Sequence, residues 1–567
     1  MDRDLQGLLD LLAGADSFEV GIGVTVREFL RRMQFVETLN ELLPWDPGQC
    51  SVSPGQRLLA LVMAFIEDRR ALFRMPEVYA RRDVELLLGA GVKAEQLNDK
   101  ALGRALDKLY AADARRVYST ICLRAVAAYQ VALDLLHNDT TSVSVYGAYE
   151  GEPHGGPEIA LSFSKDHRPD LKQFKVGATV TGEGIPIGGD VFDGNETDQI
   201  WNQKLLDWLD GWIAPGQREQ TLLCADPALV TTGNLSLLAD HQFKFVSRLP
   251  NSFGWSDVAR AEALHGPEDR WEDVGQLSPG KGKASYRLRE TTGEIDGRVY
   301  RMIVIHSSSL AERKAHSFAH RTEKEREAVQ RAGKKLLGQV FSCREDAGAA
   351  IEQALADLRL QFWETELRVE AELLEPPRRR GRPKKTEPPS AGTLVYRAHL
   401  GLGARLDAEI ERQTRWHSTF ILITNDQQCT PKELFLAYRG QANVEAAFRW
   451  LKGPVRVSPV FLKKPERVEA FGYVMLMAYL VYALVQRAIR RALPEGEQLE
   501  VEGRKTVRPT AQTMLDVIAH AKVLHVLVPG QRMRRIFLTP SAKIRRIMEL
   551  LEIPADAFLT LPELNTT

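Results

Sequence analysis

The first 130 residues carry apolar side chains three and four positions apart, with charged residues between them. This spacing collects the apolar side chains on one face of a helix and predicts amphipathic helices that pack together. It is clearest in VREFLRRMQFVETLNELL, GQRLLALVMAFIED and ALGRALDKLYAADARRVYSTICLRAVAAY. We therefore expect residues 1–130 to form an all-helical N-terminal domain.

The period changes near residue 131, where β-branched residues alternate at Thr141, Val143 and Val145. Further strands are expected at IALSFS, FKVGATVT, IPIGGDVF and TLLCAD, with a helix at DQIWNQKLLDWLDGWI. Such a mixture of strands and helices is typical of an α/β sheet with antiparallel pieces. Residues 131–250 are interpreted as the first part of this core. The second part is expected at 417–495, where the strand HSTFILITND is followed by a helical pattern.

The intervening residues 251–416 have a different character and are expected to form an inserted domain. A hairpin is predicted around KASYRLRETTGEIDGRVYRMIVIHSS, followed by a charged helix from Leu310 to Leu337 and strands near TELRVEAELL and TLVYRAHL. The stretch 376–388 is rich in proline and charge and lacks apolar residues, which indicates an exposed loop. Residues 496–567 are expected to form a basic, helical C-terminal region.

Composition agrees with several folded units. The chain has 567 residues, of which 44% are hydrophobic and 26% charged, so two to four structural units are expected. Lys plus Arg and Asp plus Glu number 75 each, so an argument for a nucleic-acid partner must rest on local clusters. One such cluster lies between Val501 and Leu550, where ten basic residues stand against three acidic ones.

Cysteine usage and apolar runs bear on the compartment. The five cysteines are far apart and form no C-x-x-C pattern, which argues against a disulfide framework or a zinc ribbon. The acidic, amphipathic start does not resemble a secretory signal, so we expect a cytoplasmic protein. The longest apolar run, Ala470 to Val485, is shorter than the roughly 18 residues that a membrane span needs. We interpret it as a buried core helix and expect no membrane partner.

Two aspartates lie where a sheet can present them to a ligand. Asp139 is in a strand-like stretch, and Asp226 ends a short strand because Pro227 follows it. Ligands of open α/β sheets bind at strand ends. Aspartate also commonly ends strands for structural reasons, so each residue taken alone is more readily explained as a turn or cap residue than as a catalyst.

A third candidate lies in PKELFLAYRGQANVEAAFRWLKGPV. Tyr438, Glu445 and Lys452 are seven residues apart, so one continuous helix would carry them along one face with Gln441 beside them. An amphipathic surface helix with incidental charges would show the same periodicity.

The same spacing resembles the Tyr-x2-Arg-x3-Glu-x6-Lys signature of bacterial insertion-sequence transposases with a ribonuclease-H-like DDE core. NDTTSVSVYG around Asp139 and LLCADPALVT around Asp226 resemble the other two blocks of that family, in the same order. The chain departs from the signature at Gln441, where the family has arginine. A neutral amide cannot grip a phosphate as a guanidinium does.

The resemblance implies a multidomain α+β protein with a ribonuclease-H-like mixed α/β catalytic core. The inserted domain would lie between the second aspartate and the glutamate, with the helical domain before the core and the helical region after it. The N-terminal domain is then expected to recognise the ends of the DNA element. A homodimer in the DNA complex is expected on the same basis.

The implied active site consists of three carboxylates, Asp139, Asp226 and Glu445, which are expected to bind two Mg²⁺ or Mn²⁺ ions. Two divalent ions roughly 4 Å apart activate a nucleophile and neutralise a leaving oxygen in phosphodiester chemistry. Carboxylate and water oxygens are the ligands that Mg²⁺ prefers. DNA contacts are expected from residues of the glutamate helix and of the loop and strand after Asp139: Tyr438, Gln441, Arg449, Lys452, Lys165, His167, Arg168 and Lys172.

A separate DNA contact is expected in PPRRRGRPKK. Its centre, Arg380-Gly381-Arg382-Pro383, resembles an AT-hook, an extended basic segment that enters the narrow minor groove of A·T-rich DNA. A solvated charged loop is the alternative interpretation.

The leading hypothesis from the sequence is a DNA transposase that acts on terminal inverted repeats and target DNA. Two alternatives stay open. One is another ribonuclease-H-like DNA nuclease, and the other is a non-catalytic DNA-binding regulator derived from such an enzyme.

Overall fold

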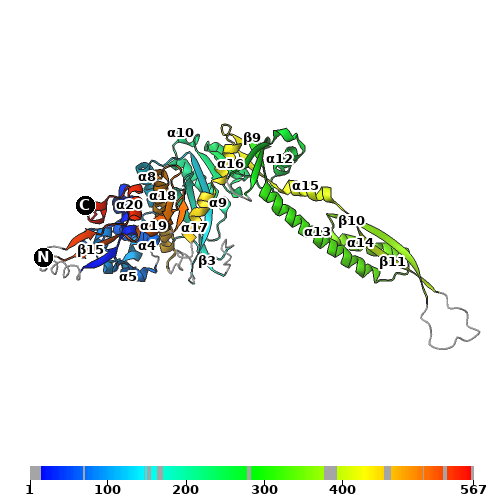
Figure 1. Cartoon of the computed structure of the whole chain (residues 1–567), viewed down its shortest axis with the longest axis horizontal. Helices are drawn as coiled ribbons and strands as arrows, with labels where there is room; N and C mark the ends of the chain where they lie inside the picture. The colour runs from blue at the N-terminus through cyan, green and yellow to red at the C-terminus, as the bar shows by residue number, and fades with distance from the viewer. Residues whose placement is uncertain are drawn as a thin grey trace, which may run out of the picture. The chain divides into compact units, whose positions relative to one another are not determined.

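The computed structural model of the chain describes residues 15–67, 70–145, 147, 149, 155–162, 170–277, 283–375, 392–452, 462–501, 503–527 and 533–562. These residues belong to two compact units (Figure 1). Unit 1 comprises Met1–Ser247 and Glu433–Thr567, and unit 2 comprises Arg248–Lys432. The inserted domain predicted at 251–416 therefore corresponds to a unit that extends further, to residue 432.

Helices dominate the N-terminal part of unit 1, in line with its three- and four-residue periodicity. Polar side chains cap some of their N-termini: Asp83 accepts a hydrogen bond from Leu86 N, and Asn98 from Ala101 N. The helices are α2 (Gly21–Arg32), α3 (Phe35–Leu42), α4 (Pro54–Glu67), α5 (Met75–Tyr79), α6 (Val84–Leu88), α7 (Asp99–Ala111) and α8 (Ala114–Tyr129), with short 3₁₀ turns η1 (Leu72–Arg74) and η2 (Ala94–Leu97).

This region is not all-helical as predicted, because it also contains the strand β1 (Asp16–Glu19). Strand β1 pairs antiparallel with β15 (Lys522–Val526), which pairs in turn with β16 (Arg534–Phe537). The C-terminal region likewise combines helices with strands: β13 (Leu499–Val501), β14 (Arg504–Thr506), α19 (Ala511–Ile518), α20 (Ala542–Leu550) and the 3₁₀ turn η5 (Ala555–Phe558). The partner of β1 lies far away in the sequence, so local periodicity does not reveal it, whereas β13 pairs with its neighbour β14 and β15 with its neighbour β16.

The strands of unit 1 between the two helical regions form a mixed ladder in the order β4-β3-β2-β5-β6. Strands β2, β3 and β4 pair antiparallel, whereas β2, β5 and β6 pair parallel. The strands are β2 (Leu135–Val145), β3 (Lys172–Thr181), β4 (Pro186–Phe192), β5 (Leu222–Ala225) and β6 (Lys244–Arg248), and the connecting helices are α9 (Asp198–Trp212), α10 (Pro215–Arg218), η3 (Pro227–Leu229) and α11 (Thr232–Asp240). This mixed α/β arrangement agrees with the predicted core.

Helix α18 (Pro465–Ala492) lies at the centre of unit 1. By length and composition it could cross a membrane, but 89% of its most apolar window is buried inside the protein, as in the core helix of a folded domain. One continuous apolar core contains residues of α18, the N-terminal helices, β2, β3, α17 (Ala442–Lys452), α19 and α20. The N-terminal, core and C-terminal segments, predicted as separate domains, therefore share a single core in this unit.

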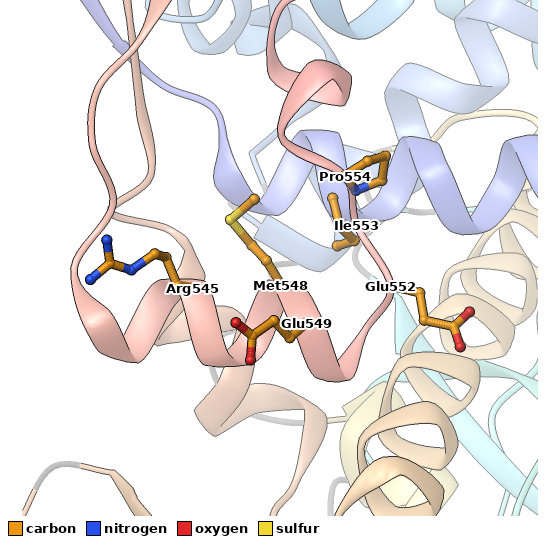
Figure 2. Close-up of a pocket in the computed structure, with 6 residues that line it drawn as sticks. All are labelled: Arg545, Met548, Glu549, Glu552, Ile553 and Pro554. Atoms are coloured by element: carbon orange, nitrogen blue, oxygen red, sulfur yellow. The ribbon is translucent and has the colours of Figure 1, made fainter.

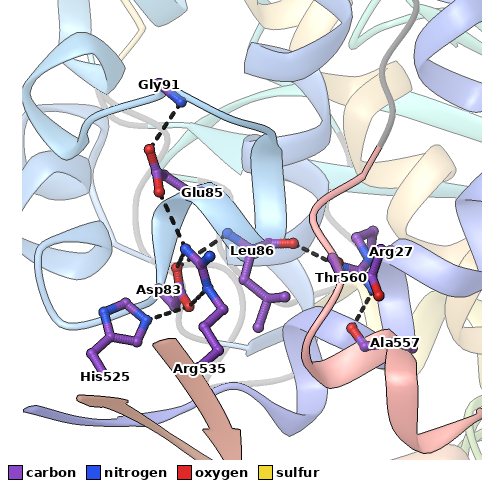
Figure 3. A network of polar contacts seen from close by, with 9 residues as sticks. All are labelled: Arg27, Asp83, Glu85, Leu86, Gly91, His525, Arg535, Ala557 and Thr560. Atoms are coloured by element: carbon purple, nitrogen blue, oxygen red, sulfur yellow. Dashed lines mark hydrogen bonds and ion pairs between the residues drawn. The ribbon is translucent and has the colours of Figure 1, made fainter. Parts of the chain in front are cut away.

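Polar contacts also connect the two ends of the chain (Figure 3). Asp83, which is buried, accepts hydrogen bonds from Arg535 Nε at 2.6 Å and contacts His525 Nε2 at 2.5 Å. Burial acts to raise the pKa of Asp83, but the hydrogen bonds from His525 and Arg535 outweigh it and lower the pKa to about 2. Arg27 donates to the carbonyl oxygens of Leu86 and Ala557. Part of the basic excess near the C-terminus is thus neutralised within the fold.

Unit 2 contains four strands hydrogen-bonded antiparallel in the order β12-β9-β8-β7. The predicted hairpin corresponds to β8 and β9, and its two-residue turn, Asp296-Gly297, has positive φ at both positions, as a type I′ turn requires. The elements are α12 (Gly254–His265), η4 (Glu268–Arg270), β7 (Glu272–Gln276), β8 (Ser285–Ile295), β9 (Arg298–Ser307), α15 (Asp407–His417), β12 (Thr419–Thr424) and the start of α16 (Pro431–Arg439).

A helical hairpin and a long strand pair form the rest of unit 2. Helices α13 (Ser308–Leu337) and α14 (Arg344–Leu358) pack on the antiparallel ladder of β10 (Trp363–Leu374) and β11 (Thr393–Arg405) (Figure 1). Their small core is built from Val329, Leu336, Ala347, Ile351, Ala398 and Leu400. The predicted basic loop 376–388 lies outside the described residues.

Candidate active site

Asp139 and Asp226 come from two neighbouring parallel strands. The register pairs Asn138 of β2 with Ala225 of β5, so the next step along both strands places Asp139 beside Asp226. Neighbouring strands lie about 4.8 Å apart. Two residues far apart in the sequence are therefore brought to adjacent positions at the end of the parallel ladder.

Local hydrogen bonds fix the backbone around both aspartates, which are half-buried. Asp226 directly follows β5 and precedes Pro227, and its carboxylate accepts a hydrogen bond from Ala228 N at 3.1 Å. The Ser247 hydroxyl of β6 donates to the Asp226 carbonyl at 2.8 Å. The Asp139 carboxylate accepts from Thr140 N at 2.7 Å. A carboxylate offers two oxygens with about four lone-pair sites, and each of these bonds uses one of them.

The two faces of β2 have different neighbours. On the face opposite Asp139, the Asn138 amide contacts the amide of Asn202 on α9 at 3.0 Å and the hydroxyl of Thr179 on β3 at 3.2 Å. On the face of Asp139, two residues earlier, His137 is fully buried. Burial lowers the pKa of His137 to about 4, so its imidazole is neutral near pH 7.

Glu445 lies in the first turn of α17, with its side chain exposed. The prediction that one continuous helix carries Tyr438, Glu445 and Lys452 is wrong, because the chain turns at Gly440 and Gln441 between α16 and α17. Bonds of the tighter i to i+3 type mark this break, from Gly440 N to Ala437 O and from Val444 N to Gln441 O.

Helix α17 packs against β2 and β3. Its inner face buries Val444, Ala447, Phe448, Trp450 and Leu451 in the common core. The Asn443 amide donates to the Gly182 carbonyl just after β3, at 2.8 Å. Glu445 and Arg449 are both exposed and, being four residues apart, lie on the same outward side of the helix. The helix is thus held to the strand pair that carries Asp139.

The other predicted site residues are placed as follows. Tyr438 in α16 and Gln441 in the turn are half-buried. Lys172 begins β3 and donates to the Tyr149 carbonyl at 3.1 Å. Lys452 is the last residue of α17, and its side chain is not among those described. The remaining predictions, Lys165, His167, Arg168, Arg380, Gly381 and Arg382, lie outside the described residues.

The aspartate pair fits a hard divalent cation. Among the described residues, no group of three or more His, Cys, Asp or Glu side chains gathers closely enough to form a metal cage. Mg²⁺ does not need one, because it keeps several waters and binds one or two carboxylates together with substrate phosphates. Asp139 and Asp226 supply such a carboxylate pair from a rigid ladder.

The sequence interpretation missed three residues near the site: His137, Asn443 and Gly440. Gly440 gave a signal, since glycine weakens a helix interior by about 1 kcal/mol relative to alanine. No local pattern singled out His137 or Asn443, whose contacts are long-range. A pocket of about 390 Å³ lies elsewhere, on α20 and the segment after it (Figure 2), and contains none of the predicted site residues.

Two known families match parts of the chain. The family described as the transposase DDE domain matches residues 135–481, a range that contains Asp139, Asp226 and Glu445. A domain of unknown function (DUF4277) matches residues 20–123, the N-terminal helices. Among curated proteins, none matches the chain.

The sequence-based recognition of a DDE transposase is confirmed at this level. Members of the family are metal-dependent enzymes that act on DNA, and they generally use divalent ions. Because the match spans more than half of the chain, this protein belongs to the DDE transposase family.

Proposed function

We propose that the protein cleaves the ends of a mobile DNA element and joins the freed 3′-hydroxyl to target DNA, with Asp139, Asp226 and Glu445 as its metal-binding carboxylates. The observation that carries this proposal is the parallel register, which continues from Asn138 and Ala225 to the two aspartates. The packing of α17 on β2 and β3 supports the inclusion of Glu445.

The proposed chemistry combines bound divalent ions with the three carboxylates that would hold them. Two Mg²⁺ or Mn²⁺ ions, when bound, would activate the attacking hydroxyl and neutralise the charge on the leaving oxygen. Asp139 and Asp226 hold their carboxylates on a ladder fixed by backbone hydrogen bonds, which limits the motion of the ligand atoms. Glu445 approaches from a helix, so its distance to the pair depends on how that helix rests on the strands.

The DNA-binding residues of the proposal extend outward from these carboxylates. Arg449 is exposed on the same side of α17 as Glu445 and can meet a phosphate. Tyr438, Gln441, Lys452 and Lys172 are assigned to the same surface, with Lys165, His167 and Arg168 from the segment before β3. Gln441 can only hydrogen-bond to a phosphate, so this surface holds DNA less tightly than the family signature would.

Two further DNA contacts complete the proposal. The segment around Arg380, Gly381 and Arg382 would enter the minor groove of A·T-rich DNA. The N-terminal helices would recognise the terminal inverted repeats, and a homodimer would bring two ends together. The N-terminal helices share a core with α18, so recognition and catalysis would be mechanically connected within unit 1.

The test uses DNA that carries the gene with its own flanking segments, incubated with the full-length protein, Mg²⁺ and a target plasmid. We expect cuts at two fixed flanking positions and covalent joining of those ends to the plasmid. Asp139→Asn, Asp226→Asn and Glu445→Gln should each abolish both steps and leave DNA binding largely intact. Glu352→Gln, an exposed carboxylate on α14, is the matched control and should behave as wild type.

The outcomes separate the alternatives. Cutting without joining would favour another nuclease of this fold. DNA binding without any metal-dependent cleavage would favour a non-catalytic regulator. Nicking and joining by the Glu445→Gln variant would show that the site is assigned incorrectly.

A further inference from the structure

His137 is a buried polar side chain without a polar partner. It is fully buried in β2, and its register neighbours, Val180 on β3 and Cys224 on β5, are also buried. Among the described residues, neither ring nitrogen has a hydrogen-bond partner. Leaving a buried polar group without a hydrogen bond costs stability. A hydrogen bond therefore does not explain the presence of the ring, and its shape becomes the relevant property.

The ring lies directly against the backbone of Gly440. A Cβ atom built on Gly440 would lie 2.7 Å from His137 Nε2 and 2.9 Å from Cε1. Carbon atoms in favourable contact are roughly 3.5–4.0 Å apart. The space between Gly440 and the His137 ring has no room for a methyl group. Gly440→Ala would therefore push β2 and the turn before α17 apart by roughly 1 Å.

This contact joins the two halves of the proposed active site. His137 precedes Asp139 by two residues and projects from the same face of β2, since side chains alternate along a strand. Gly440 lies in the turn that leads into α17, five residues before Glu445. The ring therefore supports the glutamate-bearing segment where it meets the aspartate-bearing strand.

We propose that His137 is a positioning residue whose ring, resting on Gly440, sets the height of α17 above β2 and thereby the distance from Glu445 to the aspartate pair. This inference rests on the proposed function. The Asn443–Gly182 hydrogen bond holds the helix a few residues further along, so the His137–Gly440 contact fixes its near end. Both residues act through Glu445 and neither touches substrate.

The chain offers a size-exchange test with four variants: Gly440→Ala, His137→Ala, the double variant His137→Ala/Gly440→Ala, and His137→Leu. A displacement of about 1 Å at a catalytic group can lower a rate by about 100-fold. We expect a loss of this order for Gly440→Ala, together with a higher Mg²⁺ concentration for half-maximal cleavage. Adding His137→Ala should restore much of the rate, because it removes the two atoms closest to the new methyl group and leaves only the Ala437 carbonyl oxygen, at 3.0 Å, among the three nearest atoms. His137→Leu, which keeps the bulk, should remain active.

The measurements are the cleavage rate on the flanking DNA, its Mg²⁺ dependence, DNA affinity and thermal unfolding. Gly211→Ala on α9 is the matched control, because its Cβ would meet no atom within 4 Å. A merely structural role would move the unfolding temperature without moving the Mg²⁺ dependence. The inference is overturned if the double variant cleaves no faster than Gly440→Ala, or if His137→Leu is inactive while folded. If the wild-type protein cleaves no flanking DNA with any divalent ion, the proposed function fails first and this inference fails with it.

Discussion

The contact between the two ends of the chain gives a prediction whose size follows from the structure. Asp83 → Asn removes the charge that faces Arg535 and His525 but keeps an oxygen for the hydrogen bond from Leu86 N. The helix cap is therefore preserved, and the loss is that of the ion pair. Removing one partner of a buried pair costs roughly 3–5 kcal/mol, because the other charge stays buried without compensation.

The pH dependence of stability follows from the same group. Folding lowers the pKa of Asp83 from its usual value near 3.8 to about 2. At 1.36 kcal/mol per pKa unit, this shift stabilises the folded state by about 2 kcal/mol. The carboxylate form is favoured in the folded state, so this stabilisation is complete above the unfolded pKa and is lost as the pH falls from about 4 to about 2. The Asp83→Asn variant should lack this acid-induced loss.

Hydrogen–deuterium exchange of β15 and β16, with thermal unfolding, measures the effect. A local loss of about 3 kcal/mol corresponds to exchange that is faster by about 100-fold in these strands at pH 7. The control is Glu323→Gln on α13, which removes an exposed ion pair with Arg326 and should cost less than about 1 kcal/mol. If Asp83→Asn changes exchange no more than this control, the ion pair does not hold the ends together.

Three further predictions concern charge. Burial, with Asp190 and Asp113 nearby, raises the pKa of Glu469 to about 7, so its ionisation destabilises the fold as the pH rises from about 4.5 to 7. Glu469→Gln should therefore stabilise unit 1 by about 1–2 kcal/mol at pH 8 and by nothing at pH 4. Equal unfolding temperatures of the variant and the wild-type protein at pH 8 would contradict this. Gln441→Arg should tighten DNA binding and steepen the slope of log affinity against log salt concentration by about 1, measured by fluorescence anisotropy titration. An unchanged slope would argue against a DNA phosphate at this position. Arg380→Ala with Arg382→Ala should weaken binding to A·T-rich DNA more than to G·C-rich DNA, and equal losses would leave only a non-specific charge effect.

Local patterns predicted the elements whose periodicity is strong. The charged helix α13 and the β8–β9 hairpin with its Asp-Gly turn are examples, because their signals lie within a few residues. Local sequence also predicted the positions of the two aspartates in the fold, one in a strand and one before proline. Their adjacency depends on the register between β2 and β5, which the sequence of neither strand specifies.

Long-range contacts account for what periodicity missed. A helix pattern continues across Gly440 because one glycine costs only about 1 kcal/mol, and the local sequence does not show that Gly440 lies against His137 of a distant strand. Strand β1 has no apolar alternation of its own, yet it pairs with β15 near the other end of the chain. The shared core around α18 escaped prediction because apolar helix faces do not specify which neighbours they bury against.

Exchange of the three carboxylates for thiols tests the central claim most directly. Asp139→Cys, Asp226→Cys and Glu445→Cys should each be inactive with Mg²⁺, which binds sulfur poorly, and should regain cleavage of the flanking DNA with Mn²⁺, which accepts it better. Glu352→Cys on α14 should show wild-type activity with both ions. Rescue at all three positions would place them at the same metal-dependent step. Full Mg²⁺ activity in any of the three variants would contradict the account.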